Sequence, residues 1–403
     1  MMKVINLNEE KIEKTTATKK VNYKGKNTDM PVYRIPIDLL YYNDKNDRIA
    51  TYLSKYKAKE GNFEQLSLEQ KNEIIEDFIV KSNPAEMKKT RENIKRFQQR
   101  VPGVVLKDGR VIDGNRRFTC LRKLAEETGK SEFAYFDAII LDGVTDKEIK
   151  KLELELQHGE DKPVDYNPIE KLVGIYNDII KGDFTVTEYA NSIDKKTKEV
   201  QKMVDEAELM VDFLEYIPAP EEFYIAKEMD LDGPFNEILN IKKRLKDDVE
   251  KWERARVALY DYILLRPEGD LTRLIRAMGN NIINTENEEE FFEKHVETSE
   301  KISEKIKERI EEKGEIDLEF IRENLRKDET IVEKLENNFE EYSDKTKYEN
   351  ARRRPIDQLR DFTRDVNEVD TYTISKLNEE EKDEIKEYIE DIKSKIKEIE
   401  EVL

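Results

Sequence analysis

The spacing of hydrophobic positions changes character once along this chain, near residue 145. Up to that point, short alternating or continuous apolar runs typical of strands are interleaved with amphipathic helical segments. Beyond it, almost every apolar position recurs at the three- and four-residue intervals of a helix. The pattern therefore predicts an α+β domain over residues 31–145, followed by an all-α remainder.

Within the first domain, strands are expected at Tyr33–Leu40 and at Glu132–Leu141, an aromatic and branched run. The expected helices are Tyr52–Lys57, Leu66–Lys81 and one that starts at Asn83-Pro84, buries Met87, Ile94 and Phe97, and ends at Pro102-Gly103. Residues 1–30 are polar, rich in Lys, Thr and Asn, and weakly periodic. They predict a loosely held arm with one short strand at Val4–Leu7.

The most informative stretch is Lys107–Leu124, KDGRVIDGNRRFTCLRKL. A strand over Arg110–Asp113 ends at Gly114 and an amphipathic helix follows, so Arg116 and Arg117 lie where a strand gives way to a helix. A helix N-terminus presents unpaired N–H groups and a partial positive charge, which suits a phosphate or another anion. A glycine turn followed by a solvated pair of arginines explains the same residues equally well.

A pair of short helices is expected in residues 146–217, at Thr185–Ser192 and Lys195–Met210, around a tight turn. This spacing fits a DNA-binding helix-turn-helix, although an ordinary helical hairpin is commoner. Pro218–Pro220 indicates a boundary, after which residues 218–285 are expected to form a helical domain.

The last region, residues 286–403, is rich in Glu and Lys and is expected to be helical with a coiled-coil-like end. The apolar residues of its final helix follow heptad-like spacing: Ile385, Ile389, Ile392, Ile396, Ile399 and Leu403. The spacing fits a helix that pairs with a partner helix, and it fits equally a terminal helix packed on its own chain.

Composition narrows the possible classes of protein. The chain has 403 residues, too many for one ordinary core, and 41% of them are charged. No apolar run is long enough to cross a bilayer and no signal peptide is evident, so a cytoplasmic protein is expected. The single cysteine, Cys120, excludes a disulfide framework and Cys-rich zinc sites, and two histidines leave little room for histidine-based catalysis.

The formal net charge of −20 argues against general coating of nucleic acid. Nonspecific DNA binding depends on Lys and Arg that neutralise phosphates. An acidic chain binds DNA only through a locally basic element.

The order of these motifs resembles the ParB family of partition proteins, whose N-terminal domain shares its fold with sulfiredoxin. The strand with IPID at Ile35–Asp38 precedes an Asn/Asp/Arg cluster that ends at Arg48. Gly114, Asn115, Arg116 and Arg117 match a turn that reads roughly G-E-R-R in that family. Gln157 and Asn167-Pro168-Ile169-Glu170 match a later element, and a helix-turn-helix follows. The resemblance covers about Ile35 to Tyr216.

The resemblance implies a nucleotide site, for CTP or another NTP with Mg²⁺, beside a DNA-binding module. Carried over by position, Arg48 lies near the pocket, Gly114, Asn115, Arg116 and Arg117 hold the phosphates, and Glu155 and Gln157 face the phosphates or the Mg²⁺ ion. Glu155 is then the metal ligand. The family also implies a homodimer that closes as a nucleotide-gated clamp around DNA, in a plasmid, phage or defence system.

DNA contacts are expected at the start of the second helix of the pair, where side chains reach base edges and lysines hold phosphates. The residues are Lys195, Lys196, Thr197, Lys198, Gln201 and Lys202. A helix pair that contacts protein instead is the alternative, because the surrounding segment has more acidic than basic residues.

Two other classes of function remain open from the sequence. One is an enzyme on the same fold, an NTPase, a small-molecule phosphotransferase or a nuclease, in which Asp113, Glu153 or Glu155 orients a water molecule. The other is a non-catalytic adaptor whose C-terminal helices bind a partner protein.

Overall fold

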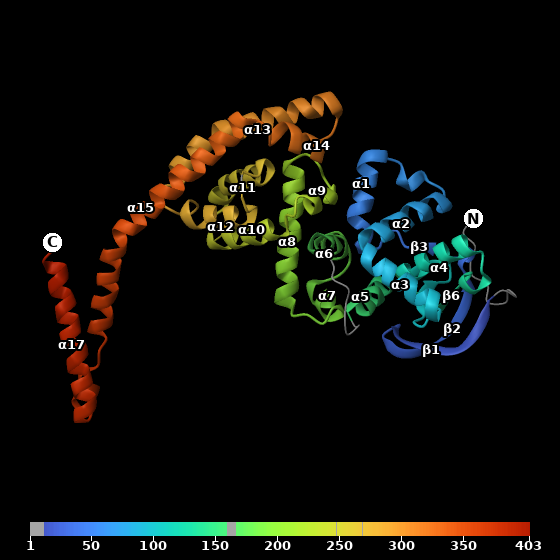
Figure 1. Ribbon diagram of the computed structural model, residues 1–403, viewed down its shortest axis with the longest axis horizontal. Helices are drawn as coiled ribbons and strands as arrows, with labels where there is room; N and C mark the ends of the chain where they lie inside the picture. Colours follow the sequence, from blue (N-terminus) through green and yellow to red (C-terminus); the bar gives the residue numbers. More distant parts are fainter. Residues whose placement is uncertain (1–11, 159–166, 247, 268) are drawn as a thin grey trace.

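The computed structural model describes residues 12–158, 167–246, 248–267 and 269–403. Figure 1 shows an elongated molecule with a sheet-containing unit at one end, a helical body in the middle and a long helical projection at the other end. The expected class, an α+β N-terminal unit followed by helices, is confirmed. Among the described residues, none of the helices combines the length and apolarity needed to span a membrane.

The N-terminal unit contains a six-stranded sheet in the order β1-β2-β6-β4-β5-β3. Pairing is antiparallel for β1 with β2, β2 with β6 and β4 with β5, and parallel for β4 with β6 and β3 with β5. The strand bounds are β1 Glu13–Tyr23, β2 Lys26–Pro36, β3 Tyr41–Tyr42, β4 Gly103–Leu106, β5 Arg110–Asp113 and β6 Tyr135–Leu141.

The expectation of a loosely held arm is wrong for residues 13–30. They form the β1–β2 hairpin, which joins the sheet through β2 and β6. Lys24 and Gly25 at its tip both have positive φ, as a two-residue hairpin turn requires. Of the two strands, Val21, Val32 and Ile35 belong to buried hydrophobic clusters and most other positions are exposed or half-buried, so the apolar signal in the sequence was weak. The strand expected at Val4–Leu7 lies outside the described residues.

Helices cover both faces of the sheet. Phe136 and Val105 face a core formed with α1 Ala50–Glu60, α2 Leu68–Ser82, α3 Pro84–Phe97 and α4 Asn115–Thr128. Ile139 and Val104, at alternate positions of the strands, face α5 Asp146–His158 on the other side. This alternation is the period of two expected of strands buried on both faces.

The remaining helices follow α5, and those between residues 168 and 342 form a body with one continuous core, from Leu154 to Tyr342. Their bounds are α6 Pro168–Ile175, α7 Val186–Ser192, α8 Thr197–Tyr216, α9 Phe223–Glu228, α10 Asp232–Arg244, α11 Val249–Leu265, α12 Leu271–Asn281, α13 Glu288–Lys313, α14 Leu318–Phe320, α15 Glu329–Asn367, α16 Thr371–Ser375 and α17 Glu379–Glu400. Single π-helical turns follow α6 at Tyr176–Ile180 and α14 at Ile321–Leu325.

The expected boundaries at 217/218 and 285/286 do not coincide with a break in this core. Phe213 of α8 packs against Phe235 of α10 and Tyr260 of α11, across Pro218–Pro220. Further on, the Tyr262 hydroxyl donates to the Leu335 carbonyl of α15 at 2.6 Å. The segment 218–285 therefore shares its core with the helices before and after it.

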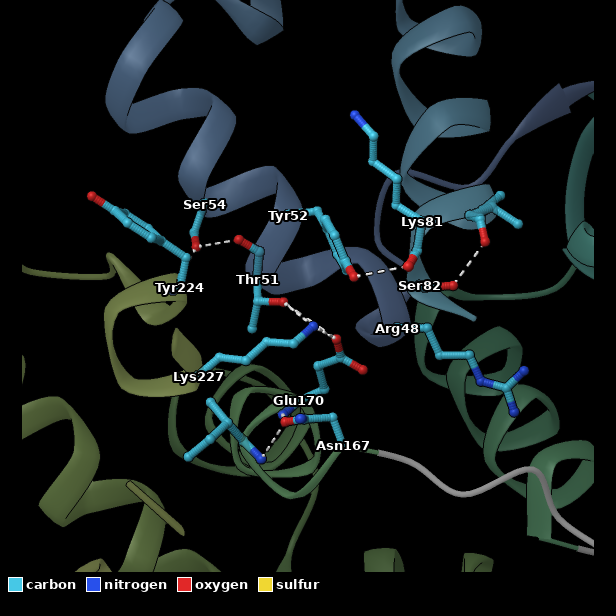
Figure 2. Close-up of polar contacts among 12 residues, drawn as sticks. Arg48, Thr51, Tyr52, Ser54, Lys81, Ser82, Asn167, Glu170, Tyr224 and Lys227 are labelled. Atoms are coloured by element: carbon cyan, nitrogen blue, oxygen red, sulfur yellow. Dashed lines mark hydrogen bonds and ion pairs between the residues drawn. The ribbon is translucent and has the colours of Figure 1, made fainter. Parts of the chain in front are cut away.

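Polar contacts join the N-terminal unit to the helical body. Lys227 of α9 pairs with Glu170 of α6 and donates to the Thr51 hydroxyl of α1 at 3.1 Å, as Figure 2 shows. The Tyr224 amide donates to the Ser54 hydroxyl at 3.1 Å. The Arg48 side chain extends away from these contacts, toward the other side of the junction.

Candidate anion-binding pocket

A cavity of about 310 Å³ lies at the end of β5, between α3, the start of α4 and the end of α5. Arg48, Gly114, Asn115, Arg116, Arg117 and Gln157 all line it. These residues come from three segments that are distant in the sequence. The structure thus brings together six of the seven residues expected at a nucleotide site.

Gly114 positions the backbone at this site. It ends β5 and precedes α4 with φ of 94°, in the left-handed region that favours glycine. A Cβ atom there would lie 2.9 Å from Phe136 Cζ. Helix α4 starts without a capping side chain, and the residues of its first turn line the cavity.

Asp113 and Arg117 form a fixed wall of the pocket. Asp113 Oδ2 lies 3.0 Å from Lys19 Nζ and 3.2 Å from Arg117 Nη2, and Lys19 also donates to the Pro102 carbonyl at 2.7 Å. Burial by itself would raise the pKa of Asp113, but the positive charges of Arg117 and Lys19 outweigh it and lower that pKa. Lys19 of β1 was missed by sequence reasoning because β1 was interpreted as an arm.

Arg116 lies in a less compensated environment. Its side chain is 22% exposed, and its ion pair with Glu86 of α3 spans 3.8 Å. Burial lowers the pKa of the Arg116 guanidinium, and the nearby positive charge of Arg48 lowers it further. Two guanidinium groups that repel each other in one cavity are a favourable environment for an anion, because an anion would relieve the repulsion.

The lining of the pocket is positive although the chain is acidic. Its basic residues are Arg48, Lys89, Arg100, Arg116 and Arg117, against the acidic residues Glu86 and Asp113. Asn115 is 9% exposed, and its Oδ1 atom has no hydrogen-bond partner among the described residues. The pocket therefore carries a local excess of positive charge.

Glu155 is the expected site residue that the structure does not place in the pocket. Its Oε1 atom accepts a hydrogen bond from Asn22 of β1 at 3.1 Å and lies 3.9 Å from Lys151 Nζ. Residues two apart on a helix point in nearly opposite directions, so Glu155 and Gln157 cannot both face the cavity. In the described part of the chain, no group of three His, Cys, Asp or Glu side chains is arranged to hold a metal ion.

Two basic residues of the pocket were missed by sequence reasoning. Lys89 follows Glu86 by three residues on α3, and Arg100 lies in the loop after the helix. Met87 and Ile94 are buried as expected, but Phe97 is 40% exposed and lies under the guanidinium groups of Arg96 and Arg100. The polar face of α3 was the available signal.

A second cavity, of about 760 Å³, lies on the other side of the 3₁₀ turn Asp47–Ile49. A buried cluster in its wall joins Lys150 Nζ to Asp47 at 2.6 Å and to Asp178 at 3.4 Å, with Glu153 at 4.0 Å. Burial raises the pKa of Glu153 to about 7, and burial also raises the pKa of Asp178 to about 7. Glu153, which the sequence suggested as a residue that orients water, therefore interacts with Lys150 in this cluster.

The expected helix pair is present as α7 and α8, although α8 starts at Thr197 rather than Lys195. All six residues expected to contact DNA are exposed: Lys195, Lys196, Thr197, Lys198, Gln201 and Lys202. Acidic residues one turn further on neutralise part of this surface, since Lys195 pairs with Glu199 at 3.3 Å and Lys202 with Glu206 at 3.5 Å.

No family model and no curated protein sequence matches this chain.

Proposed function

We propose that the pocket beside Gly114 binds the phosphates of a nucleotide, CTP or another NTP, in a ParB-like protein that also binds DNA. The observation that carries the proposal is the convergence of Arg48 and Gln157 with the Gly114–Arg117 turn around one positive cavity. Arg48 comes from the 3₁₀ turn, Gln157 from α5 and the glycine turn from the β5–α4 connection.

Each part of the pocket has a role in this proposal. The guanidinium groups of Arg48 and Arg116 pair with phosphate oxygens, and the N-terminal amides of α4 donate to them. The volume of about 310 Å³ lies near the small end of ligand cavities, which suits a compact, highly charged ligand. Because Glu155 points elsewhere, Mg²⁺ would enter bound to the phosphates and retain its waters.

The experiment is calorimetric titration of the full chain with CTP, ATP and GTP in Mg²⁺, repeated with Arg116→Ala. We expect one nucleotide to bind and the variant to lose about 100-fold in affinity, since charged hydrogen bonds contribute roughly 1.5–3 kcal/mol each. Lys88→Ala and Lys89→Ala form a matched pair, because the two lysines are adjacent on α3 and only Lys89 lines the pocket. Absence of binding to all three nucleotides by the folded wild type would refute the proposal.

The proposed function is nucleotide binding without hydrolysis. The carboxylates that line the pocket, Glu86 and Asp113, both pair with arginines, so neither is set up to orient water. Release of phosphate at a steady rate without DNA would instead support an NTPase on this fold.

The DNA-binding part of the proposal depends on the exposed start of α8. Replacement of Lys196 and Lys198 by alanine should weaken binding to duplex DNA and reduce the slope of log affinity against log salt by about 2, near 0.9 for each lost phosphate contact. A control with the same change in charge is Lys307→Ala with Lys313→Ala on α13, where both lysines are also exposed. Equal effects of the two double variants would argue that α7 and α8 contact protein rather than DNA.

A further inference from the structure

The second cavity, of about 760 Å³, contains buried carboxylates that neither the nucleotide site nor the DNA-binding helices use. It lies where the N-terminal unit meets the helical body, between α1, α5, the π-helical turn after α6 and the loop before α9. Its volume is within the range of cavities that hold small organic ligands. Its lining shares only Asn46 with that of the anion-binding pocket, so the two cavities are separate sites.

Negative side chains are in excess in the lining of this cavity. It contains eight acidic and five basic residues. Among the acidic residues, Glu221 pairs outside the lining with Lys181. Three basic residues also have carboxylate partners outside the lining: Lys57 pairs with Glu64 at 2.7 Å, Lys147 with Glu188 at 2.9 Å and Arg110 with Asp108 at 3.9 Å. These outside partners neutralise more positive than negative charge, so they increase the negative excess within the cavity.

Two carboxylate oxygens in the wall, Glu153 Oε1 and Asp178 Oδ2, have no hydrogen-bond partner among the described residues. Glu153 is 3% exposed and Asp178 is 9% exposed. Lys150 is the cation they share with Asp47, so one ammonium faces three carboxylates. Burial raises the pKa of Glu153 and of Asp178, and the negative charge of Asp47 raises both further. A ligand that donates hydrogen bonds and carries positive charge would compensate these buried groups.

A primary ammonium group suits this wall better than a metal ion. An ammonium group carries three donors, and Lys150 shows that the cluster holds such a group, with Nζ 2.6 Å from Asp47 Oδ2. In the described ranges of the chain, no three His, Cys, Asp or Glu side chains are arranged to hold a metal ion. Apolar side chains that can pack against methylene groups complete the lining: Ala50, Leu53, Ala58, Ile149, Val173, Phe184 and Phe223.

We propose that the second cavity binds a small aliphatic amine, whose primary ammonium group lies against Glu153 and Asp178 and whose methylene chain packs on the apolar wall. The amine supplies the positive charge and the hydrogen-bond donors that Lys150 alone does not provide. This proposal goes beyond the nucleotide and DNA sites and does not depend on them, because the cavity contains neither the arginines of the nucleotide pocket nor the lysines of α8.

Calorimetric titration of the full chain with putrescine, without nucleotide, tests the proposal. We expect the wild type to bind the diamine and Glu153→Gln to weaken binding by about tenfold or more, the effect of losing one charged hydrogen bond. Glu155→Gln is the matched control, because it removes the same charge from the same helix but lies outside the cavity lining. Circular dichroism checks that both variants keep the wild-type helicity.

Two further measurements separate this site from others. Asp178→Asn should weaken putrescine binding in the same way as Glu153→Gln, because both carboxylates face the ammonium group. Arg116→Ala, which should abolish most nucleotide binding, should leave putrescine affinity unchanged, so failure of one site is distinguishable from failure of the other.

Three results would overturn the proposal. The first is absence of putrescine binding by the folded wild type. The second is equal weakening by Glu153→Gln and Glu155→Gln, which would attribute binding to the net charge of −20. The third is equal affinity for tetramethylammonium, a cation without hydrogen-bond donors, which would show that the carboxylates do not accept hydrogen bonds from the ligand.

Discussion

Two neighbouring residues of the 3₁₀ turn, Asp47 and Arg48, serve regions of opposite electrostatic character. Asp47 faces a buried cluster in which one lysine is shared by three carboxylates. Arg48 faces a pocket in which arginines and lysines outnumber carboxylates. Both regions are built on the same turn and on α5. They differ in the sign of the charge that is in excess among their side chains.

Carboxylates are in excess in the cluster, whereas basic side chains are in excess in the pocket. Lys150 remains charged because its carboxylate partners more than offset its burial and hold its pKa well above the usual value. Gly174 allows α6 to approach the cluster closely, since a Cβ atom there would lie 2.9 Å from Asp47 Oδ2. The cluster therefore fastens the N-terminal unit to the helical body, whereas the pocket is the place where we propose that a nucleotide binds.

The largest effect is expected from removal of the central cation of the cluster. Lys150→Ala leaves three buried carboxylates without their partner, so the free energy of unfolding should fall by about 3–5 kcal/mol. Denaturant unfolding measures the change, with Lys151→Ala, an exposed neighbour on α5, as the control. A loss below about 1 kcal/mol would mean that water enters the cluster and the comparison with the pocket fails.

The next largest effect on stability is expected from a substitution in the glycine turn of the pocket. Gly114→Ala should destabilise the protein by about 2–3 kcal/mol, since it combines an unfavourable φ with a close approach to Phe136. Gly129→Ala at the other end of α4 is the matched control, because it has positive φ but no atom within 4 Å of the added Cβ. Thermal unfolding that ranks the two variants equally would remove the close approach as a cause.

A smaller, pH-dependent effect is expected from the cluster. The folded-state pKa values of Glu153 and Asp178, about 7, lie above the ordinary values of 4.5 and 3.8, so the folded protein binds more protons between these limits. Stability should therefore fall by roughly 1–2 kcal/mol as the pH rises from about 6 to 8. Urea unfolding at both pH values measures it, and Glu153→Gln should reduce the difference. A stability that rises over this interval would contradict the assignment.

The smallest expected effect is on nucleotide affinity, and it tests which residues form the boundary of the pocket. Arg96 and Arg100 both lie over the Phe97 ring, at 4.9 and 4.3 Å, but only Arg100 lines the cavity. Arg100→Ala should weaken nucleotide binding by about tenfold, close to one charged contact of about 1.4 kcal/mol, and Arg96→Ala should not. If both variants weaken binding alike, long-range charge rather than the pocket governs affinity.

Local sequence signals predicted most elements of the N-terminal unit. The strand Arg110–Asp113 and the helix after Gly114 were found because a short apolar run, a glycine and an amphipathic segment follow one another without a gap. The β1–β2 hairpin was missed because its strands are largely exposed and rich in Lys and Thr, so they carry little hydrophobic alternation.

The sequence predicted those residues of the candidate site that lie in one turn or that follow from the order of motifs in the family. Asn115, Arg116 and Arg117 follow directly from the turn, and Arg48 and Gln157 came from the order of motifs. Glu155 was assigned by alignment to a matching position, but the rotation of α5 directs it to Asn22. Lys19 had no local signal, because β1 brings it to Asp113 from a segment far away in the chain.

The sequence by itself determined the change from an α+β unit to a helical remainder, the glycine turn with its two arginines and the heptad-like stripe of the last helix. These features depend on spacing within a few consecutive residues, which local backbone geometry translates directly into structure. Only the tertiary structure decided that Asp47 and Arg48 face opposite regions, that residues 218–285 share a core with their neighbours, and that Ile389 and Ile396 of α17 are exposed. Those outcomes depend on contacts between segments far apart in the chain. The free energy of such contacts depends on both segments, so it cannot be derived from the sequence of either segment alone.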